Sequence, residues 1–165
     1  MSRLKRLPVW VRDALIFVVL LAGVRAYQQR GLPTGPSPAL SGQTVTGQAV
    51  RLSDYRGAPV LVHFWATWCG VCRAEEGHVS ELSQELPVIT IASRSGQPQA
   101  IRAYLAERGL EFDAIADPTG KLAARFGVRA FPTTFVLSST GAIRHVEVGY
   151  TTELGMRARM WLAGL

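Results

Sequence analysis

Residues 60–65 (VLVHFW) form a short apolar run, and the first of two cysteines, Cys69 and Cys72, follows four residues later. Six residues are too few for a core helix, and valine, phenylalanine and tryptophan favour strands, so we expect a buried central strand. From about Cys69 the sequence has helical character, which ends before Pro87. The cysteine pair is therefore predicted to lie where a buried strand passes into a helix.

The remaining elements predict a mixed sheet. Further strands are expected at 88–92, 112–116, 133–137 and 143–148, helices at 98–108, 120–126 and 153–163, and a small hairpin in 43–55 that turns at Gly47. A β-α-β-α beginning followed by a β-hairpin and a helix places helices on both faces of a mixed central sheet. The predicted fold class is α/β with an N-terminal β-hairpin extension.

The formal charge of +6 lies almost entirely in residues 1–30, which carry +5. The other 135 residues carry +1, so no basic patch for DNA or RNA is predicted. Residues 1–6 are basic and 14–24 are an unbroken apolar run. As a helix, the wider window 8–27 would be about 30 Å long, the thickness of a bilayer's hydrocarbon core.

Residues 1–27 are therefore predicted to be a signal anchor in the inner (cytoplasmic) membrane, with the rest of the chain in the periplasm. A cleaved signal peptide, with Val24 and Ala26 before the cleavage site, is the alternative. Residues 28–42 contain three prolines and three glycines, a composition typical of a linker, and the folded domain is predicted to span 43–165.

The spacing of Cys69 and Cys72 suits redox chemistry. Cysteines three residues apart at a helix start can form a disulfide with little backbone movement. The helix N-terminus favours a thiolate at the first cysteine, and a thiolate is the species that attacks a disulfide. A structural disulfide and a metal site that recruits His63 or His78 remain alternatives, whereas haem attachment is excluded because Arg73 follows Cys72.

Residues 64–75 (FWATWCGVCRAE) closely resemble the active-site segment of the thioredoxin superfamily, and most of all its membrane-anchored periplasmic branch of the TlpA, ResA and DsbE type. Residues 117–121 and 126–128 resemble the stretch before that branch's cis-proline loop, and 131–135 (FPTTF) resemble the loop itself. The end of the chain is loosely similar to disulfide oxidoreductases linked to copper tolerance. The resemblance implies a thioredoxin fold for the domain.

It also implies roles for individual residues. Cys69 would attack, Cys72 would resolve the mixed disulfide, and Pro132 would be the cis-proline facing them. Trp68, Phe131 and Thr133 would border the bound substrate. Glu75 matches an acidic residue that could tune the thiol pKa values or relay protons, and a solvated helix charge is the alternative. Its neighbour Glu76 is expected to be a solvated helix charge.

His63 departs from the family pattern, because it occupies a buried position where thioredoxins have aspartate and this branch often asparagine. A neutral histidine there could shuttle the Cys72 proton, and a buried packing residue is the alternative. Phe131 is bulky for the position before the cis-proline, and the residue at this position helps to choose partners in the superfamily.

The resemblance implies a protein thiol-disulfide oxidoreductase that needs no bound cofactor. Its partners would be protein disulfides or thiols and a transmembrane thiol carrier of the DsbD or CcdA type. Anchored members more often act as reductants, in cytochrome c maturation or copper-centre assembly. A disulfide-forming oxidase and a Cu(I)-binding module that uses Cys69, Cys72 and a histidine are the alternatives.

Overall fold

The computed structural model describes residues 8–29 and 32–164, and the chain divides into two compact units, Met1–Arg30 and Gly31–Leu165. In the first unit, helix α1 spans Val9–Gln29. None of the helices formed by the described residues is both long enough and apolar enough to cross a membrane.

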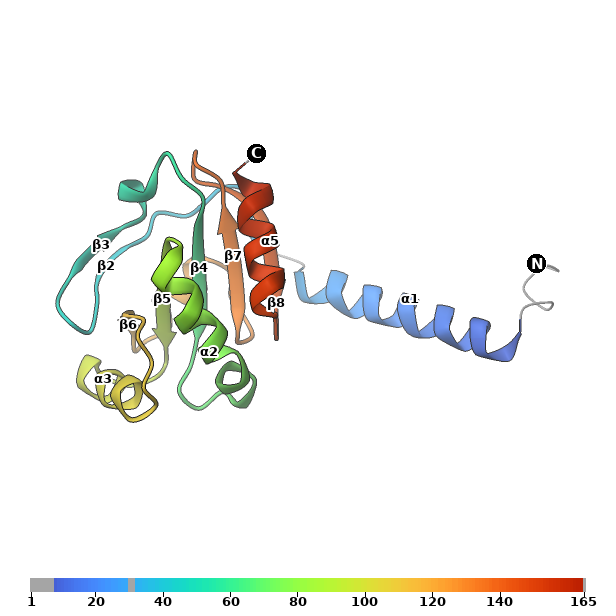
Figure 1. The fold of residues 1–165 in the computed structure, drawn as a ribbon, viewed down its shortest axis with the longest axis horizontal. Helices are drawn as coiled ribbons and strands as arrows, with labels where there is room; N and C mark the ends of the chain where they lie inside the picture. The colour runs from blue at the N-terminus through green and yellow to red at the C-terminus, as the bar shows by residue number, and fades with distance from the viewer. Residues whose placement is uncertain (1–7, 30–31, 165) are drawn as a thin grey trace. The chain divides into compact units, whose positions relative to one another are not determined.

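The second unit is built on a six-stranded mixed sheet with the strand order β1-β8-β7-β4-β5-β6 (Figure 1). The strands are β1 (Gly35–Pro36), β4 (Val60–Trp65), β5 (Val88–Ser93), β6 (Ala114–Asp117), β7 (Thr133–Leu137) and β8 (Ala142–Val148). Strands β4, β5 and β6 are parallel, whereas β7 is antiparallel to both β4 and β8. All six residues of β4 are buried, as expected for a central strand with both faces covered.

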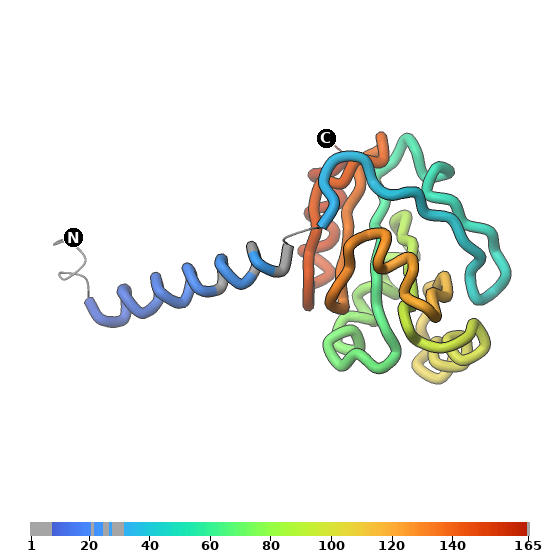
Figure 2. Tube along the Cα trace, turned by 180° about the vertical axis from the view of Figure 1, so that it is seen from behind, coloured from blue at the N-terminus to red at the C-terminus, as the bar shows by residue number. Residues whose placement is uncertain are grey.

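Each face of the sheet has its own apolar core, because successive side chains of a strand point to opposite faces. Leu61 and Trp65 pack with apolar residues of helices α2 (Gly70–Glu85), α3 (Pro98–Glu107) and α5 (Glu153–Ala163). On the opposite face, Phe64 packs against Phe126 and Phe135. The short helix α4 (Lys121–Arg125) lies on this face, which Figure 2 shows from behind. Helices therefore cover both faces, and the predicted α/β arrangement is confirmed.

The segment before β4 forms the predicted hairpin. Strands β2 (Ser41–Gln43) and β3 (Ala49–Arg51) pair antiparallel around a turn in which Gly47 has a φ of 96°. The 3₁₀ helix η2 (Leu52–Tyr55) follows. The hairpin is attached to β6 because the Val45 amide donates to the Ala114 carbonyl, and to α3 because the Arg102 guanidinium donates to the Val45 carbonyl.

Part of the segment predicted as linker belongs to the folded unit. β1 pairs with Ala142 and Ile143 of β8, and Leu40 is 3% exposed in the core. The proline and glycine content that indicated a linker suits an edge strand as well, because only one side of an edge strand needs backbone hydrogen bonds.

Candidate active site

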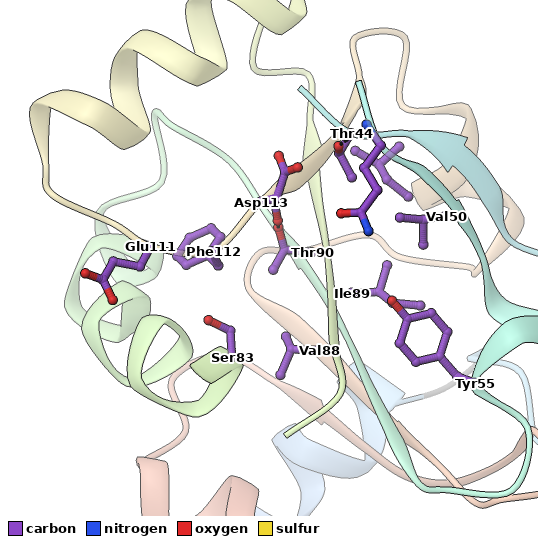
Figure 3. Close-up of a pocket in the computed structure, with 12 residues that line it drawn as sticks. Thr44, Val50, Tyr55, Ser83, Val88, Ile89, Thr90, Glu111, Phe112 and Asp113 are labelled. Carbon is purple, nitrogen blue, oxygen red and sulfur yellow. Dashed lines mark hydrogen bonds between the residues drawn. The ribbon is translucent and has the colours of Figure 1, made fainter. Parts of the chain in front are cut away.

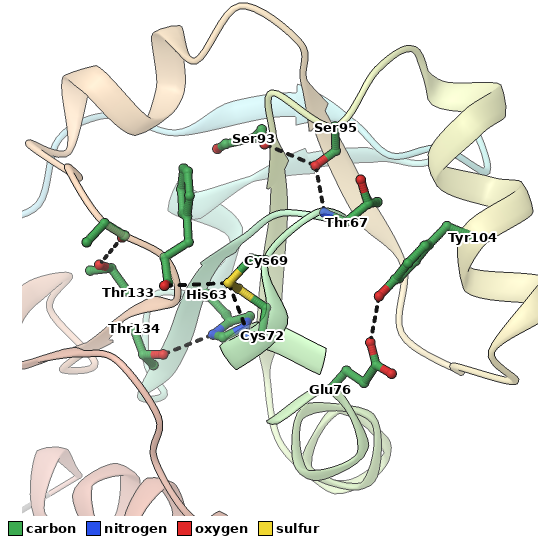
Figure 4. The surroundings of a disulfide bond; sticks show 12 residues. His63, Thr67, Cys69, Cys72, Glu76, Ser93, Ser95, Tyr104, Thr133 and Thr134 are labelled. Carbon is green, nitrogen blue, oxygen red and sulfur yellow. Dashed lines mark hydrogen bonds between the residues drawn. A yellow bond between two sulfur atoms is a disulfide. The ribbon is translucent and has the colours of Figure 1, made fainter. Parts of the chain in front are cut away.

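The disulfide between Cys69 and Cys72 lies where β4 passes into α2, as the spacing predicted (Figure 4). Cys69 is the N-cap of α2, and the backbone N–H of Cys72 donates to the Cys69 Sγ at 3.1 Å. This hydrogen bond and the positive end of the helix both stabilise negative charge on the Cys69 sulfur once the pair is reduced. Cys69 is thereby the better thiolate of the two.

Accessibility hardly distinguishes the two cysteines. Cys69 is 7% exposed and Cys72 is 4% exposed, so both are buried in the disulfide form. The chemical difference between the cysteines therefore depends on the helix terminus rather than on solvent access.

The loop that contains Pro132 faces the disulfide. The Phe131–Pro132 peptide bond is cis, and the Phe131 carbonyl oxygen lies 3.5 Å from the Cys69 Sγ. The Pro132 carbonyl accepts from the Gly149 amide at 2.8 Å, which ties the loop to the end of β8. Thr133 is 1% exposed and its hydroxyl donates to the Ala130 carbonyl, so its side chain shapes the loop instead of facing solvent.

The two tryptophans near the cysteines have different environments. Trp68 is 58% exposed, its Nε1 donates to the Arg94 carbonyl at 3.0 Å, and its ring meets the Phe131 ring edge-on at 5.7 Å between centroids. Trp65 is 2% exposed and packs against Tyr104 and Phe112 in the core. Trp68 and Phe131 thus form an apolar surface beside the disulfide, while Trp65 is a core residue.

His63 is buried at the centre of β4, on the face that α2 covers. Its Nδ1 lies 2.9 Å from the hydroxyl of Thr134, the residue opposite it on β7, and in the view of Figure 4 the ring lies beside the cysteine pair. Burial lowers the pKa of His63 to about 4, so the imidazole is neutral at physiological pH. A neutral imidazole can accept a proton but adds no positive charge near the sulfur atoms.

Glu75 is fully buried on α2, one turn after Cys72. Neither carboxyl oxygen has a hydrogen-bond partner among the described residues. Burial raises the pKa of Glu75 to about 8, and the backbone amide of Thr151, which approaches without reaching hydrogen-bond geometry, opposes this shift more weakly. A carboxyl in this position holds its proton at neutral pH and can release it when a nearby group changes charge.

The expectation for Glu76 is wrong. This residue is 9% exposed, and its carboxylate accepts hydrogen bonds from the Tyr104 hydroxyl at 2.9 Å and from the Arg108 guanidinium. It fastens α2 to α3, because both partners belong to the end of α3. The sequence pattern placed Glu76 on an exposed helix face, and only the docking of α3 covers it.

Sequence reasoning missed two polar residues that support this site, one in β7 and one just after β5. Thr134 is the hydrogen-bond partner of His63, and the Ser95 hydroxyl accepts from the Thr67 amide at 3.0 Å, which fixes the loop before Cys69. The register that pairs β4 with β7 was the signal that could have identified Thr134, since it places Thr134 opposite His63.

Two further observations concern ligands. A hollow of about 140 Å³ lies between the hairpin and β5, bordered by Thr44, Val50, Tyr55 and Thr90 (Figure 3). Neither the cysteines nor the Pro132 loop lines it. In the part of the chain that the structure describes, no three His, Cys, Asp or Glu side chains are grouped to hold a metal ion.

Comparison with known proteins gives the family. Residues 34–146 match the AhpC/TSA family, which is more than half of the chain. The chain belongs to the AhpC/TSA family. The thiol-disulfide oxidoreductase ResA of Geobacillus thermodenitrificans is 34% identical over 124 residues, which cover 73% of this chain and 70% of the relative. The thiol:disulfide interchange protein DsbE of Pseudomonas fluorescens is 35% identical over 124 residues, 74% of this chain and 70% of the relative.

A solved structure gives the same assignment of fold. The exposed lipoprotein thioredoxin Etrx1 of Streptococcus pneumoniae superposes with a TM-score of 0.65 at 27% identity, over 75% of this chain and 98% of that structure. The fold is thioredoxin-like, with a mixed sheet and a small N-terminal hairpin. With these relatives and the Cys69–Cys72 disulfide, the chain is a thiol-disulfide oxidoreductase.

Proposed function

We propose that this chain reduces disulfides of other proteins outside the cytoplasm, with Cys69 as the attacking thiolate. The observation that carries the proposal is the position of Cys69 at the N-terminus of α2. Its Sγ accepts a hydrogen bond from the Cys72 backbone amide and lies 3.5 Å from the Phe131 carbonyl oxygen. A backbone carbonyl beside the reactive sulfur can position an extended peptide chain by strand-like hydrogen bonding.

The exchange has two steps. The Cys69 thiolate attacks one sulfur of the substrate disulfide, so that a mixed disulfide forms and the other substrate sulfur leaves as a thiolate. The Cys72 thiol then loses its proton and attacks the Cys69 Sγ, which releases the second substrate thiolate. The substrate gains two electrons, and the Cys69–Cys72 disulfide remains.

The proton of Cys72 needs an acceptor, because both cysteines are buried. We assign His63 and Glu75 as residues that manage this proton. His63 is neutral and can accept it, while Glu75, one helical turn from Cys72, has a pKa raised to about 8 and can accept a proton only in its ionised form. Both groups lack a full charge at neutral pH, which keeps the buried site free of fixed charge in the disulfide state.

The absence of charge on the buried residues His63 and Glu75 at neutral pH also supports the reducing direction. An oxidant such as DsbA has a strongly stabilised reduced form with a low thiol pKa. Here Gly70 and Val71 separate the cysteines, and the buried His63 carries no positive charge to stabilise a thiolate further. Anchored members of the branch that the chain resembles more often act as reductants, in cytochrome c maturation or copper-centre assembly.

The reduction potential of the Cys69–Cys72 pair tests the direction. We expect a value near the figure of about −270 mV known for thioredoxin, rather than near the figure of about −120 mV for DsbA. The measurement equilibrates the protein with glutathione or dithiothreitol buffers and counts the free thiols by alkylation and mass spectrometry. A potential near that of DsbA would assign the chain as an oxidase instead.

Residues 1–27 are proposed to direct the chain across the inner membrane and to keep it attached there. The basic start and the apolar run 14–24 support this location. A reductant in the periplasm needs electrons from the cytoplasm, and a transmembrane thiol carrier of the DsbD or CcdA type is the proposed source.

Attachment predicts that the full-length protein fractionates with membranes and keeps its complete mass. The test expresses the full chain and a form that begins at Gly31, then compares membrane and soluble fractions by intact-mass spectrometry. The shortened form is expected in the soluble fraction. A mature soluble protein that starts at Tyr27 would show instead that the segment is cleaved.

A further inference from the structure

A hollow of about 270 Å³ lies beside the Pro132 loop. Phe131 forms one wall of it, Ala123 and Ala124 line it from α4, and Arg94 and Arg129 are also among its lining residues. The guanidinium nitrogens of Arg94 lie beside Gly120, which lines the hollow as well. Both arginines are exposed. The hollow is therefore open to solvent and strongly basic.

The hollow is continuous with the surface around the disulfide. Phe131 belongs to both, since its carbonyl oxygen lies 3.5 Å from the Cys69 Sγ and its ring packs on Trp68. Arg94 is held to the same surface, because its carbonyl accepts from the Trp68 Nε1. A peptide chain that crosses Phe131 to reach Cys69 thus passes the mouth of the hollow.

The positive charge in the hollow is not neutralised by the protein. Among the described residues, the side chains of Arg94 and Arg129 make no ion pair. Asp117 lies at the end of β6 nearby, but it is 3% exposed and its carboxylate accepts from Ser93, Leu122 and Ala123. Its oxygens are already engaged inside the fold.

Gly120 leaves room for the Arg94 side chain. A Cβ built on Gly120 would come within 2.8 Å of the Arg94 Nε, so the absence of a side chain at position 120 lets the guanidinium lie across this backbone. Gly120 also has a φ of 73°, a conformation that other residues rarely adopt. The guanidinium is thereby held at the hollow without a carboxylate partner.

We propose that this hollow binds an acidic side chain of the substrate protein, close to the cysteine that exchanges with Cys69. The inference rests on the proposed function and narrows its substrate class to cysteines flanked by aspartate or glutamate. A carboxylate is the ligand that two unpaired guanidinium groups recognise, through charge-assisted hydrogen bonds. Phe131 would lie between the exchanging sulfur and the bound carboxylate.

The test compares three peptides, each with a single cysteine that is held in a disulfide. The peptides differ only in the residue beside this cysteine, which is aspartate, asparagine or lysine. The full chain, reduced in detergent, is mixed with each peptide, and the second-order rate constant of reduction is followed at low and high salt. We expect the aspartate peptide to react about fivefold faster than the asparagine peptide at low salt, and the lysine peptide to react slowest. High salt should reduce the difference.

Two variants test whether the preference for the aspartate peptide arises at the arginines of the hollow. Arg94→Gln/Arg129→Gln is expected to bring the aspartate and asparagine rates within twofold of each other. Arg129→Gln alone is expected to give an intermediate ratio, and it avoids Arg94, whose φ of 50° could make a substitution affect folding. Arg144→Gln removes the same charge from an exposed position of β8. This position lies several residues before the end of β8 that contacts Pro132, so the variant should keep the wild-type ratio.

Hydroxyethyl disulfide is small and uncharged, so its reduction needs the cysteines but not the acidic subsite. Its rate of reduction therefore tests the proposed function independently of this inference. Equal rates for the aspartate and asparagine peptides, with hydroxyethyl disulfide still reduced, would overturn the acidic subsite alone. An unchanged peptide preference in the double variant would do the same. Failure of the wild-type protein to reduce hydroxyethyl disulfide would instead contradict the proposed function.

Discussion

Replacing Cys72 with serine is expected to abolish turnover and to trap the natural substrate in a mixed disulfide with Cys69. Cys69 keeps the helix N-terminus and the amide hydrogen bond that stabilise its thiolate, so the first attack still occurs. No thiol remains to resolve the product. The measurement is a non-reducing gel of thiol-blocked cell extract, followed by mass spectrometry of the trapped band.

Cys69→Ser is the matched control and is expected to trap nothing. Cys72 lies one helical turn inside α2 and lacks the N-cap position, so the helix N-terminus does not favour its thiolate as it does that of Cys69. A small alkylating agent should modify Cys69 of the reduced protein faster than Cys72. The opposite order of reactivity would reverse the assignment of attacking and resolving cysteines.

The stability of the oxidised protein is expected to have an unusual dependence on pH, because Glu75 and His63 act in opposite directions. The folded state raises the pKa of Glu75 from 4.5 to about 8, so the folded protein binds more protons than the unfolded chain across that range. Stability therefore falls as pH rises from 4.5 to 8. The folded state lowers the pKa of His63 from 6.5 to about 4, so this residue makes stability rise from pH 4 to 6.5.

The two slopes cancel between pH 4.5 and 6.5 and leave a plateau, each slope being about 1.4 kcal/mol per pH unit at full strength. Above pH 6.5 only the effect of Glu75 remains, and the free energy of unfolding should fall by about 2 kcal/mol by pH 8. Urea unfolding of the oxidised domain across this range measures the profile.

Substitutions show which residue causes each of the two pH-dependent changes in stability. Glu75→Gln should remove the fall above pH 6.5, and stability should then rise between pH 4.5 and 6.5. His63→Asn should instead replace the plateau by a steady fall. Glu107→Gln, which changes an exposed carboxyl on α3, is expected to keep the wild-type profile. A fall above pH 6.5 that survives in Glu75→Gln would show that Glu75 is ionised in the folded state.

The His63→Asn variant also reports on catalysis. An asparagine side chain can still reach Thr134 by hydrogen bonding but cannot accept a proton from Cys72. Release of the mixed disulfide should therefore slow more than its formation, as measured in single-turnover reactions with a peptide disulfide. Equal effects on both steps would make His63 a packing residue.

Much of the active site follows from local sequence. The apolar run 60–65 has both faces to bury, and this fixes β4 as a central strand. The short segment that follows it starts α2 at Gly70, and the N-cap position then falls on Cys69. These features depend on neighbours within a few residues, so hydrophobic pattern and capping chemistry are sufficient to predict them.

The environment of each side chain could not be predicted from local sequence in the same way. Glu75 and Glu76 illustrate this. They are adjacent glutamates of one helix, and both are buried, yet Glu76 is paired with Tyr104 and Arg108 while Glu75 has no such partner. Only the packing of α3 and of the segment around Thr151 against α2 separates them. Helical periodicity gives the direction of a side chain, but it does not give what that side chain meets.

The sequence by itself determined the order of the elements that follow residue 43, the cysteine pair at a strand–helix junction and the loop that carries Pro132. The tertiary structure decided the partner of His63, the membership of residues 35–40 in the folded unit, and the meeting of Arg94 and Arg129 at one hollow. Each of these depends on strand register or on contacts between residues far apart in the chain. Local preferences do not encode such contacts, because they form only when the sheet and its helices assemble.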